Sequence, residues 1–215
     1  MSGDRERLAL LGHELRSPVA ALAAVSEALA DETLDTSARR RLLGLAVRAC
    51  AAIDRLASDA SVTSITPRTT DVLGLVEEAA ASAALRGTRT VRITSQLSTL
   101  TLEADPLRVR QALDNLVANA MSFSPPGEDV VIHVATRDGL ALISVVDVGP
   151  GIPAGDQERV FQLGIRLDDQ RPGSGIGLAV SRAIAEAHGG TLTVESTAGS
   201  GAAFTLALPL SSPSS

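Results

Sequence analysis

Apolar residues recur at alternating steps of three and four along the N-terminal part of the chain. Residues 4–30 carry one such stripe, and residues 37–62 repeat it after a polar break at 31–36. This spacing is typical of the a and d positions of a helical seam. The stripe positions are Leu8, Leu11, Leu15, Pro18, Leu22, Val25 and Leu29, followed by Leu42, Ala46, Ala49, Ile53, Leu56 and Ala60.

Two helices joined by a short break form a hairpin, and one hairpin alone leaves much of its apolar seam in water. Pairing two hairpins into a four-helix bundle buries that seam. We therefore expect residues 1–66 to form an all-α hairpin domain that makes the protein a homodimer.

The pattern changes after residues 64–70, which are interpreted as a linker punctuated by Pro67. Beyond it, helical and strand periods mix without strict alternation, which is typical of an α+β domain at 67–215. Asp105 and Pro106 form a strong helix start, as cap and first-turn proline. The expected elements are helices at 71–85, 105–123 and 176–188, and strands at 89–95, 99–103, 130–136, 140–148, 191–195 and 202–208.

Composition narrows the partners and the compartment. Hydrophobic residues make up 45% of the 215 positions, enough for a sizeable core, and every basic residue is Arg. The net charge of −6 argues against nucleic acid as a partner. A single cysteine, Cys50, rules out a disulfide framework within the chain and fits a reducing compartment. Because no apolar run has the length of a membrane span, the chain itself is expected to be soluble, with no membrane contact.

The first expected helix places one histidine in an exposed position. In the frame set by Leu8 and Leu15 at a, His13 falls at f and points away from the seam. A neutral imidazole in water is a nucleophile near neutral pH. The neighbouring Glu14 can hold its Nδ1–H and leave Nε2 free, and Pro18 is expected to bend the helix beyond it. Most exposed helical histidines have no function, so the surrounding residues decide.

Residues 13–19, His-Glu-Leu-Arg-Ser-Pro-Val, resemble the H-box of sensor histidine kinases. The resemblance implies that His13 is the phosphoacceptor and that Glu14 assists its phosphorylation. It also implies that Ser17 orients water in a phosphatase reaction, although the family more often has Thr or Asn at that position.

Two asparagines, Asn115 and Asn119, lie one turn apart on the expected helix at 105–123. Their amide oxygens can hold Mg²⁺ without repelling a triphosphate. Taken alone, they are more simply explained as a polar helix face. The segment resembles the N-box of the GHKL ATP-binding fold, which implies Asn119 as the main Mg²⁺ ligand and Asn115 in support. Ser122 stands where the family often has Lys.

Asp147 ends an apolar strand and is followed by Gly149 and Gly151. A carboxylate at a strand end can accept a hydrogen bond from an exocyclic amine, and glycines let a ligand approach the backbone. The simpler alternative is an ordinary strand-ending turn. The segment resembles the G1 box, which implies that Asp147 accepts from the adenine amino group.

Gly173, Gly175, Gly177 and Leu178 open the last expected helix. Glycine-rich backbone before a helix N-terminus favours phosphate binding. A dinucleotide-binding unit would need a strand directly before the glycines and GxGxxG spacing. Residues 168–172 are polar and the spacing is GxGxG, so the segment resembles the G2 box instead.

In the GHKL fold the stretch between these two glycine motifs is a lid over ATP. Phe161, after Val160, resembles the F-box, whose usual second aromatic is replaced here by Leu163. Arg166 and Arg171 are the basic residues of this stretch and are candidate contacts for the γ-phosphate.

Three residues are set outside these motifs. His188 precedes a Gly-Gly pair and is interpreted as a helix-end residue favourable to the helix dipole. His133 is interpreted as a structural strand residue, and Cys50 as a small buried hydrophobe beside the seam.

The resemblance covers nearly the whole chain and implies the catalytic core of a sensor histidine kinase, with a dimerisation hairpin at 1–66 and a GHKL-type ATP-binding α+β sandwich at 67–215. It implies autophosphorylation on His13 with ATP and Mg²⁺, then transfer to the receiver domain of a response regulator in two-component signalling. The expected location is the cytoplasm, whether or not a membrane-anchored sensor precedes the chain. Two alternatives stay open: a dimeric phosphotransferase or adaptor with a degenerate ATP site, and a GHKL protein serine kinase.

Overall fold

The computed structural model describes residues 2–30, 34–60, 65–86, 90–167 and 175–210, and of residues 2–14, 47–48, 51, 54–60 and 86 only the backbone. The chain divides into two compact units, Met1–Ser61 and Val62–Ser215. The sequence pattern predicts this division between residues 66 and 67.

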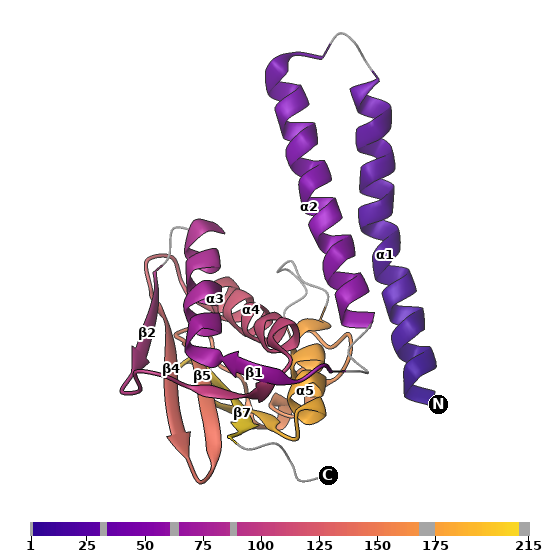
Figure 1. Cartoon of the computed structure of the whole chain (residues 1–215). Helices are drawn as coiled ribbons and strands as arrows, with labels where there is room; N and C mark the ends of the chain where they lie inside the picture. Colours follow the sequence, from indigo (N-terminus) through magenta and orange to yellow (C-terminus); the bar gives the residue numbers. More distant parts are fainter. Residues whose placement is uncertain (1, 31–33, 61–64, 87–89, 168–174, 211–215) are drawn as a thin grey trace. The chain divides into compact units, whose positions relative to one another are not determined.

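The first unit consists of two long helices, α1 (Ser2–Leu29) and α2 (Thr36–Ala60), which run side by side in opposite directions (Figure 1). Val25 and Ala49 of the apolar stripes are buried, whereas Val19 and Leu43 are about half exposed. Asp35 caps α2, because its Oδ1 accepts a hydrogen bond from the Ala38 N–H at 2.7 Å. Cys50 is exposed, so the interpretation as a buried hydrophobe is wrong; it lies one position beyond the buried stripe.

The second unit mixes helices and strands. In chain order they are β1 (Arg68–Asp71), α3 (Val72–Arg86), β2 (Val91–Ser95), β3 (Thr101–Ala104), α4 (Pro106–Phe123), β4 (Val130–Arg137), β5 (Leu140–Asp147), the short 3₁₀ turns η1 (Ala154–Asp156) and η2 (Arg159–Phe161), α5 (Gly177–Ala187), β6 (Thr191–Ser196) and β7 (Ala202–Pro209).

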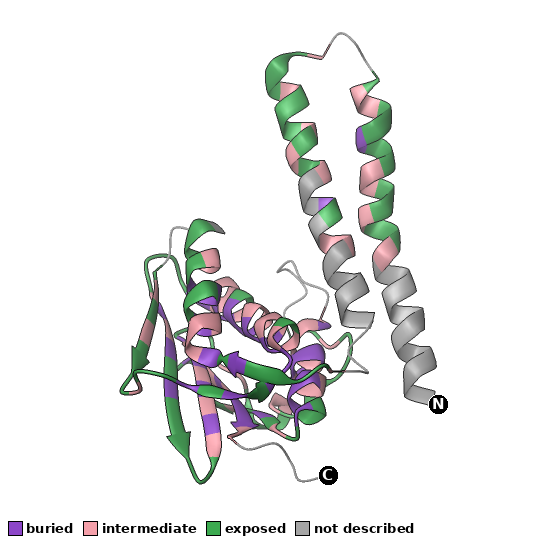
Figure 2. Ribbon diagram, viewed as in Figure 1, coloured by how far each residue is buried: buried purple, intermediate pink, exposed green. Residues whose placement is uncertain are grey.

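A five-stranded sheet in the order β2-β4-β5-β7-β6 forms the base of this unit. Only β2 and β4 are parallel; the other neighbouring pairs are antiparallel. Burial alternates residue by residue along β5, so one face of the sheet is covered and the other is open. Helices α3, α4 and α5 lie on the covered face, where the buried residues gather (Figures 1 and 2).

Helix α4 is the central helix of this layer, and its sequence explains its ends. Asp105 accepts hydrogen bonds from the N–H groups of Leu107 and Arg108 at 3.0 and 3.2 Å, and Pro106 occupies the first turn. The helix therefore begins where the sequence predicts. Its buried stripe is Val109, Ala112, Leu113, Leu116, Val117 and Ala120.

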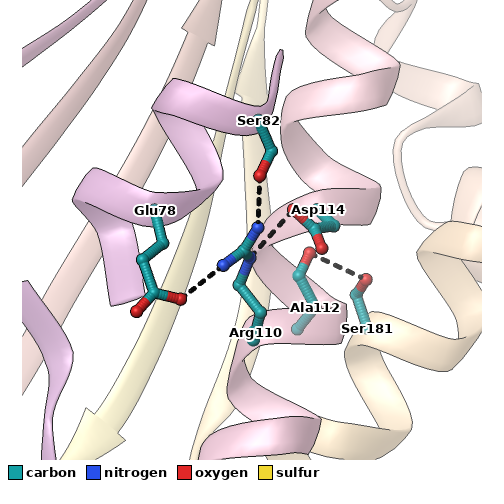
Figure 3. A network of polar contacts seen from close by, with 6 residues as sticks. All are labelled: Glu78, Ser82, Arg110, Ala112, Asp114 and Ser181. Atoms are coloured by element: carbon teal, nitrogen blue, oxygen red, sulfur yellow. Dashed lines mark hydrogen bonds and ion pairs between the residues drawn. The ribbon is translucent and has the colours of Figure 1, made fainter. Parts of the chain in front are cut away.

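Polar contacts hold α4 to both neighbouring helices (Figure 3). The Arg110 guanidinium reaches α3, donating to Glu78 Oε2 and to Ser82 Oγ, each at 2.7 Å. It also pairs with Asp114 one turn along α4, at 3.1 Å. On the other side, the buried Ser181 hydroxyl of α5 lies 3.4 Å from the Ala112 carbonyl oxygen. These contacts set the position of α4.

The predicted linker at 64–70 is wrong in its second half. Residues 68–71 form β1, which pairs antiparallel with β3 in a separate two-stranded sheet. Thr70 is buried there, with its Oγ1 2.9 Å from the Ala104 carbonyl oxygen. The Thr66 N–H also donates to Asp105 Oδ2 at 2.9 Å. The chain is therefore tied to this unit from Thr66 onward.

His188 follows α5 as its C-terminal cap and is buried. Its Nε2 accepts a hydrogen bond from the Asp105 N–H at 2.9 Å, and its Nδ1 lies 2.7 Å from the Ile184 carbonyl oxygen. A ring that accepts through one nitrogen and donates through the other is a neutral imidazole. His188 is therefore a helix-end residue, as the sequence predicts, and its ring also bonds to the residue before α4.

Candidate functional site

Asp147 lies at the C-terminal end of β5 and is 4% exposed. Its Oδ1 accepts a hydrogen bond from the Gly149 N–H at 2.8 Å. Burial raises the pKa of this carboxyl group, opposed by hydrogen bonds from the backbone of Gly149 and Ala202. The structure thus provides a buried carboxyl group held by the loop after β5 and by β7, suited to accept a hydrogen bond from a ligand.

The glycines after Asp147 are required by the fold itself. A Cβ on Gly149 would lie 2.9 Å from the Phe123 carbonyl oxygen at the end of α4. Gly151 has a φ of +69°, and a Cβ there would overlap the Thr197 carbonyl oxygen. Larger residues at either position would push the loop away from α4 or from the β6–β7 turn.

The predicted asparagines lie on α4, one turn apart. Asn115 donates through Nδ2 to the Gly177 carbonyl oxygen at 3.3 Å, which joins the middle of α4 to the first residue of α5. Asn119 is half-buried in the next turn. Of the predicted site residues, the structure therefore brings Asn115 and Gly177 into direct contact, and Leu178 follows Gly177 on α5.

Gly177 differs from the loop glycines because the protein leaves room for a side chain there. A Cβ on Gly177 would meet the Asn115 side chain at 3.5 Å, an ordinary van der Waals distance. Its φ is not in the left-handed region. Packing against the described residues therefore does not require a glycine at this position.

Phe161 has protein partners on two sides. Its ring lies edge-on to Phe204 of β7, with 6.2 Å between the ring centroids. The Arg182 guanidinium lies over the ring, 5.1 Å from its centroid. Hydrogen bonds to Glu158 and Glu186 raise the pKa of Arg182. The predicted F-box residue, at the end of η2, thus packs into the core between Phe204 and the Arg182 guanidinium.

A backbone hydrogen bond connects the stretch between the two glycine motifs to the second motif. The Gly164 N–H donates to the Gly175 carbonyl oxygen at 3.1 Å, and Arg166 follows as an exposed residue. The other predicted residues of this stretch, Arg171 and Gly173, lie outside the described residues.

The predicted catalytic residues of the first unit are on α1. The backbone of His13 and Glu14 is helical, but their side chains lie outside the described part of the chain. Position f for His13 therefore stays a prediction. Ser17 is exposed, and Pro18 lies inside the helix.

Two residues outside the predicted motifs hold the loop after Asp147. Ser196 and Gln157 both bond to Ile152, at distances of 2.8 and 3.2 Å. Neither has a sequence signal, because a serine at a strand end and a glutamine after a turn are common surface residues. They are identified only by the hydrogen bonds that Ser196 and Gln157 make to Ile152 in the folded chain.

Taken together, α4 contacts both glycine segments, through Asn115 at Gly177 and through Phe123 beside Gly149. Residues 104–212 match the family model described as histidine kinase-, DNA gyrase B-, and HSP90-like ATPase. The chain belongs to this family. The predicted GHKL fold of the second unit is thereby confirmed.

Relatives and solved structures extend the similarity over both units. The adaptive-response sensory kinase SasA of Synechococcus sp. (strain JA-2-3B'a(2-13)) is 33% identical over 94% of this chain and 58% of its own length. The sensor-like histidine kinase SenX3 of Mycobacterium tuberculosis (strain H37Rv) is 37% identical over 95% of this chain and 53% of its own. The crystal structure of full-length ShkA in complex with AMPPNP matches 98% of this chain and 47% of its own, with a TM-score of 0.72 and 25% identity.

The chain thus spans a little over half the length of the curated relatives it matches. Within the described parts of the chain, no helix combines the length and the apolar character needed to cross a bilayer.

Proposed function

We propose that the chain is the catalytic core of a sensor histidine kinase, which moves the γ-phosphoryl group of ATP to His13 and then to a response regulator receiver domain. The observation that carries this proposal is the contact of α4 with both glycine segments, through Asn115 and Phe123. Relatives named histidine kinases, similar over 94–95% of the chain, support it.

In this proposal the nucleotide is held from two sides. Asp147 accepts a hydrogen bond from the adenine amino group, with Gly149 and Gly151 setting the shape of the loop that follows it. Gly175, Gly177 and the N-terminus of α5 face the phosphates, with Gly173 and Leu178 completing the motif. The free space at the Gly177 Cβ position supports a ligand at this point.

The amide groups on α4 fit a magnesium ion. Asn115 uses its Nδ2 for Gly177, which leaves its Oδ1 able to act as a ligand. Asn119, one turn away, adds a second neutral oxygen. Asn119 and Asn115 would hold Mg²⁺, which neutralises charge on the phosphates during transfer.

The phosphoryl transfer itself uses α1. His13 Nε2 attacks the γ-phosphorus while the bond from phosphorus to the bridging oxygen of ADP breaks, and ADP leaves. Glu14 accepts the Nδ1–H and keeps the imidazole in the reactive tautomer. Arg166 and Arg171 are proposed to contact the γ-phosphate, and Phe161 supports the segment that carries them. Positioning and charge neutralisation supply most of the catalysis.

The proposal that the protein is a homodimer is based on apolar residues of α1 and α2 that are exposed in the single chain. Val19 and Leu43 are 53% and 51% exposed, and Leu45 is also exposed. Packing two such pairs into a four-helix bundle would cover these side chains. Ser17, exposed on α1, is proposed to orient water when the phosphoryl group is removed from the regulator.

Incubation with γ-labelled ATP and Mg²⁺ tests this function. The label should be acid-labile and alkali-stable, and it should disappear in His13→Gln. His133→Gln is the matched control, because His133 is exposed on β4, and it should keep the label. Absence of both label and ATP binding would favour the adaptor, and acid-stable label on a partner serine would favour the serine kinase.

A further inference from the structure

The loop after Asp147 depends on other segments for its shape. Residues 148–153 belong to no helix or strand. Ser196, at the end of β6, holds this loop through its hydroxyl group, which accepts from the Ile152 N–H at 2.8 Å and donates to the Gly201 carbonyl oxygen at 2.6 Å. One hydroxyl thus uses both its donor and an acceptor to join the loop to the β6–β7 turn.

Gln157, just after η1, completes a ring of hydrogen bonds with the same residues. Its Nε2 donates to the Ile152 carbonyl oxygen at 3.2 Å and to the Ser196 carbonyl oxygen at 2.8 Å. Both backbone groups of Ile152 are therefore held by side chains from outside the loop. The Gly199 N–H adds a bond of 2.6 Å to the Pro150 carbonyl oxygen.

This ring is linked to the candidate adenine contact through the loop backbone. Ile152 follows Gly149 by three residues, and the Gly149 N–H orients the Asp147 carboxyl group together with the Ala202 backbone. Release of Ile152 would let the loop shift, and the Gly149 N–H would then leave Asp147. The orientation of the buried carboxylate thus depends on residues that do not touch it.

We propose that Ser196 and Gln157 are positioning residues that set both the nucleotide affinity and the preference for adenine. The inference rests on the proposed function, because it assigns them to the same nucleotide site. They act through Ile152 and the loop, without touching the nucleotide.

Three variants and a control test it. Ser196→Ala removes the hydroxyl, and Ser196→Thr retains one. Gln157→Glu replaces the side-chain NH₂ group, which donates both hydrogen bonds, with a carboxylate oxygen that would face two carbonyl oxygens. Ser144→Ala is the matched control, because the half-buried Ser144 hydroxyl pairs with Thr205 Oγ1 at 2.8 Å on the same sheet. The measurements are Kd values for ATP and GTP by calorimetry, KM and kcat for autophosphorylation, and Tm.

Ser196→Ala and Gln157→Glu should each raise the Kd and KM for ATP about tenfold, the loss expected from one to two hydrogen bonds. The ATP/GTP preference should fall by a similar factor, while kcat at saturating ATP stays within about twofold. Ser196→Thr should restore most of the affinity. Ser144→Ala should lower Tm about as much as Ser196→Ala and leave both Kd values unchanged.

Different failures have different meanings. If the wild type binds ATP and both variants keep its affinity and preference, the inference is overturned and the proposed function stands. If the wild type does not bind ATP, both are overturned. A folding defect in one variant leaves the other to decide, and amide hydrogen exchange at Ile152 reports the release of the loop independently of nucleotide. Unchanged exchange in a folded Ser196→Ala protein would also count against the inference.

Discussion

The Nε2 atom of His188 accepts a hydrogen bond from the backbone N–H of Asp105, 83 positions earlier in the chain, at 2.9 Å. The two residues stand at the end of α5 and just before the start of α4, so the bond ties together the two helices that carry the candidate phosphate and magnesium residues. The Asp105 carboxylate in turn receives the Thr66 N–H. A chain of hydrogen bonds, buried at His188 and Asp105 and exposed at Thr66, therefore joins α5, α4 and the segment before β1.

Replacement of His188 by Ala should cost about 1–3 kcal/mol of unfolding free energy, because it leaves the buried Asp105 N–H without an acceptor. His133→Ala should stay within about 0.5 kcal/mol, since His133 is exposed and bonds to the exposed Thr94 hydroxyl. Urea unfolding followed by circular dichroism suits a chain without Trp or Tyr. Equal losses in the two variants would contradict a structural role for the His188 bond.

The sequence predicted those elements whose signals are local. The start of α4 follows from Asp105 and Pro106, and the alternation in 140–148 predicts β5 with Asp147 at its end. β1 was missed because four residues carry little periodicity, and its partner β3 lies about thirty residues away. The acceptor role of His188 and the loop contacts of Ser196 were missed for the same reason, since each depends on a partner distant in the chain.

The roles of individual glycines in the two motifs also cannot be predicted from the sequence. Sequence spacing identifies Gly151 and Gly177 as members of motifs but does not separate their roles. The backbone does: Gly151 needs its positive φ and faces the Thr197 carbonyl oxygen, whereas Gly177 has space for a Cβ. The fold requires glycine at position 151, whereas packing of the described residues does not require it at position 177.

Gly177→Ala should therefore keep the stability of the wild type, or gain slightly from the better helix propensity of alanine. ATP affinity should fall by at least about tenfold, because the new methyl group would occupy space proposed for a phosphate. Thermal unfolding without nucleotide and calorimetric ATP binding measure the two effects. Unchanged affinity in Gly177→Ala would remove this residue from the proposed site.

Gly151→Ala is the matched comparison and should behave in the opposite way. A Cβ there meets backbone and the φ of +69° is unfavourable, so unfolding free energy should fall by more than about 1 kcal/mol. A stable Gly151→Ala protein would show that the loop can move away from the β6–β7 turn.

Asp147→Asn should separate binding from stability. Burial raises the folded-state pKa of Asp147 above its usual value of 3.8, so the ionised carboxylate disfavours the folded state at neutral pH. Asn removes that cost, and its side-chain oxygen can still accept the Gly149 N–H. The variant without nucleotide should be at least as stable as the wild type at neutral pH, and this advantage should vanish below pH 3.8.

ATP affinity should move the other way in Asp147→Asn, falling by about tenfold or more with the loss of a charge-assisted hydrogen bond. Thermal unfolding across a pH series and calorimetry supply the data. A variant that is less stable at neutral pH would mean that the carboxylate supports the fold, contrary to the raised pKa.

Asp105→Asn should show the reverse pH dependence. Burial acts to raise the pKa of Asp105, but hydrogen bonds from the backbone N–H groups of Thr66, Arg108 and Leu107 outweigh it and hold the pKa below 3.8. A carboxyl group whose folded-state pKa is lowered stabilises the fold above its unfolded pKa, and this contribution is lost as the pH falls through the folded-state value. Asn still accepts hydrogen bonds at the helix start but presents an NH₂ group where the second carboxylate oxygen was.

The variant should therefore lose about 1 kcal/mol or more at neutral pH, with the difference from wild type shrinking as the pH falls below 3.8. Asp71→Asn is the control. Asp71 is exposed, and within the described residues its side chain accepts one hydrogen bond, from the Gly74 N–H to Oδ1 at 3.2 Å. Its loss should be smaller. Urea unfolding at a series of pH values makes the comparison, with exchange of the Thr66 amide as a local probe. A difference for Asp105→Asn that grows in acid would reverse the sign argued here, and unchanged Thr66 exchange would mean that the chain entering this unit is held by β1 alone.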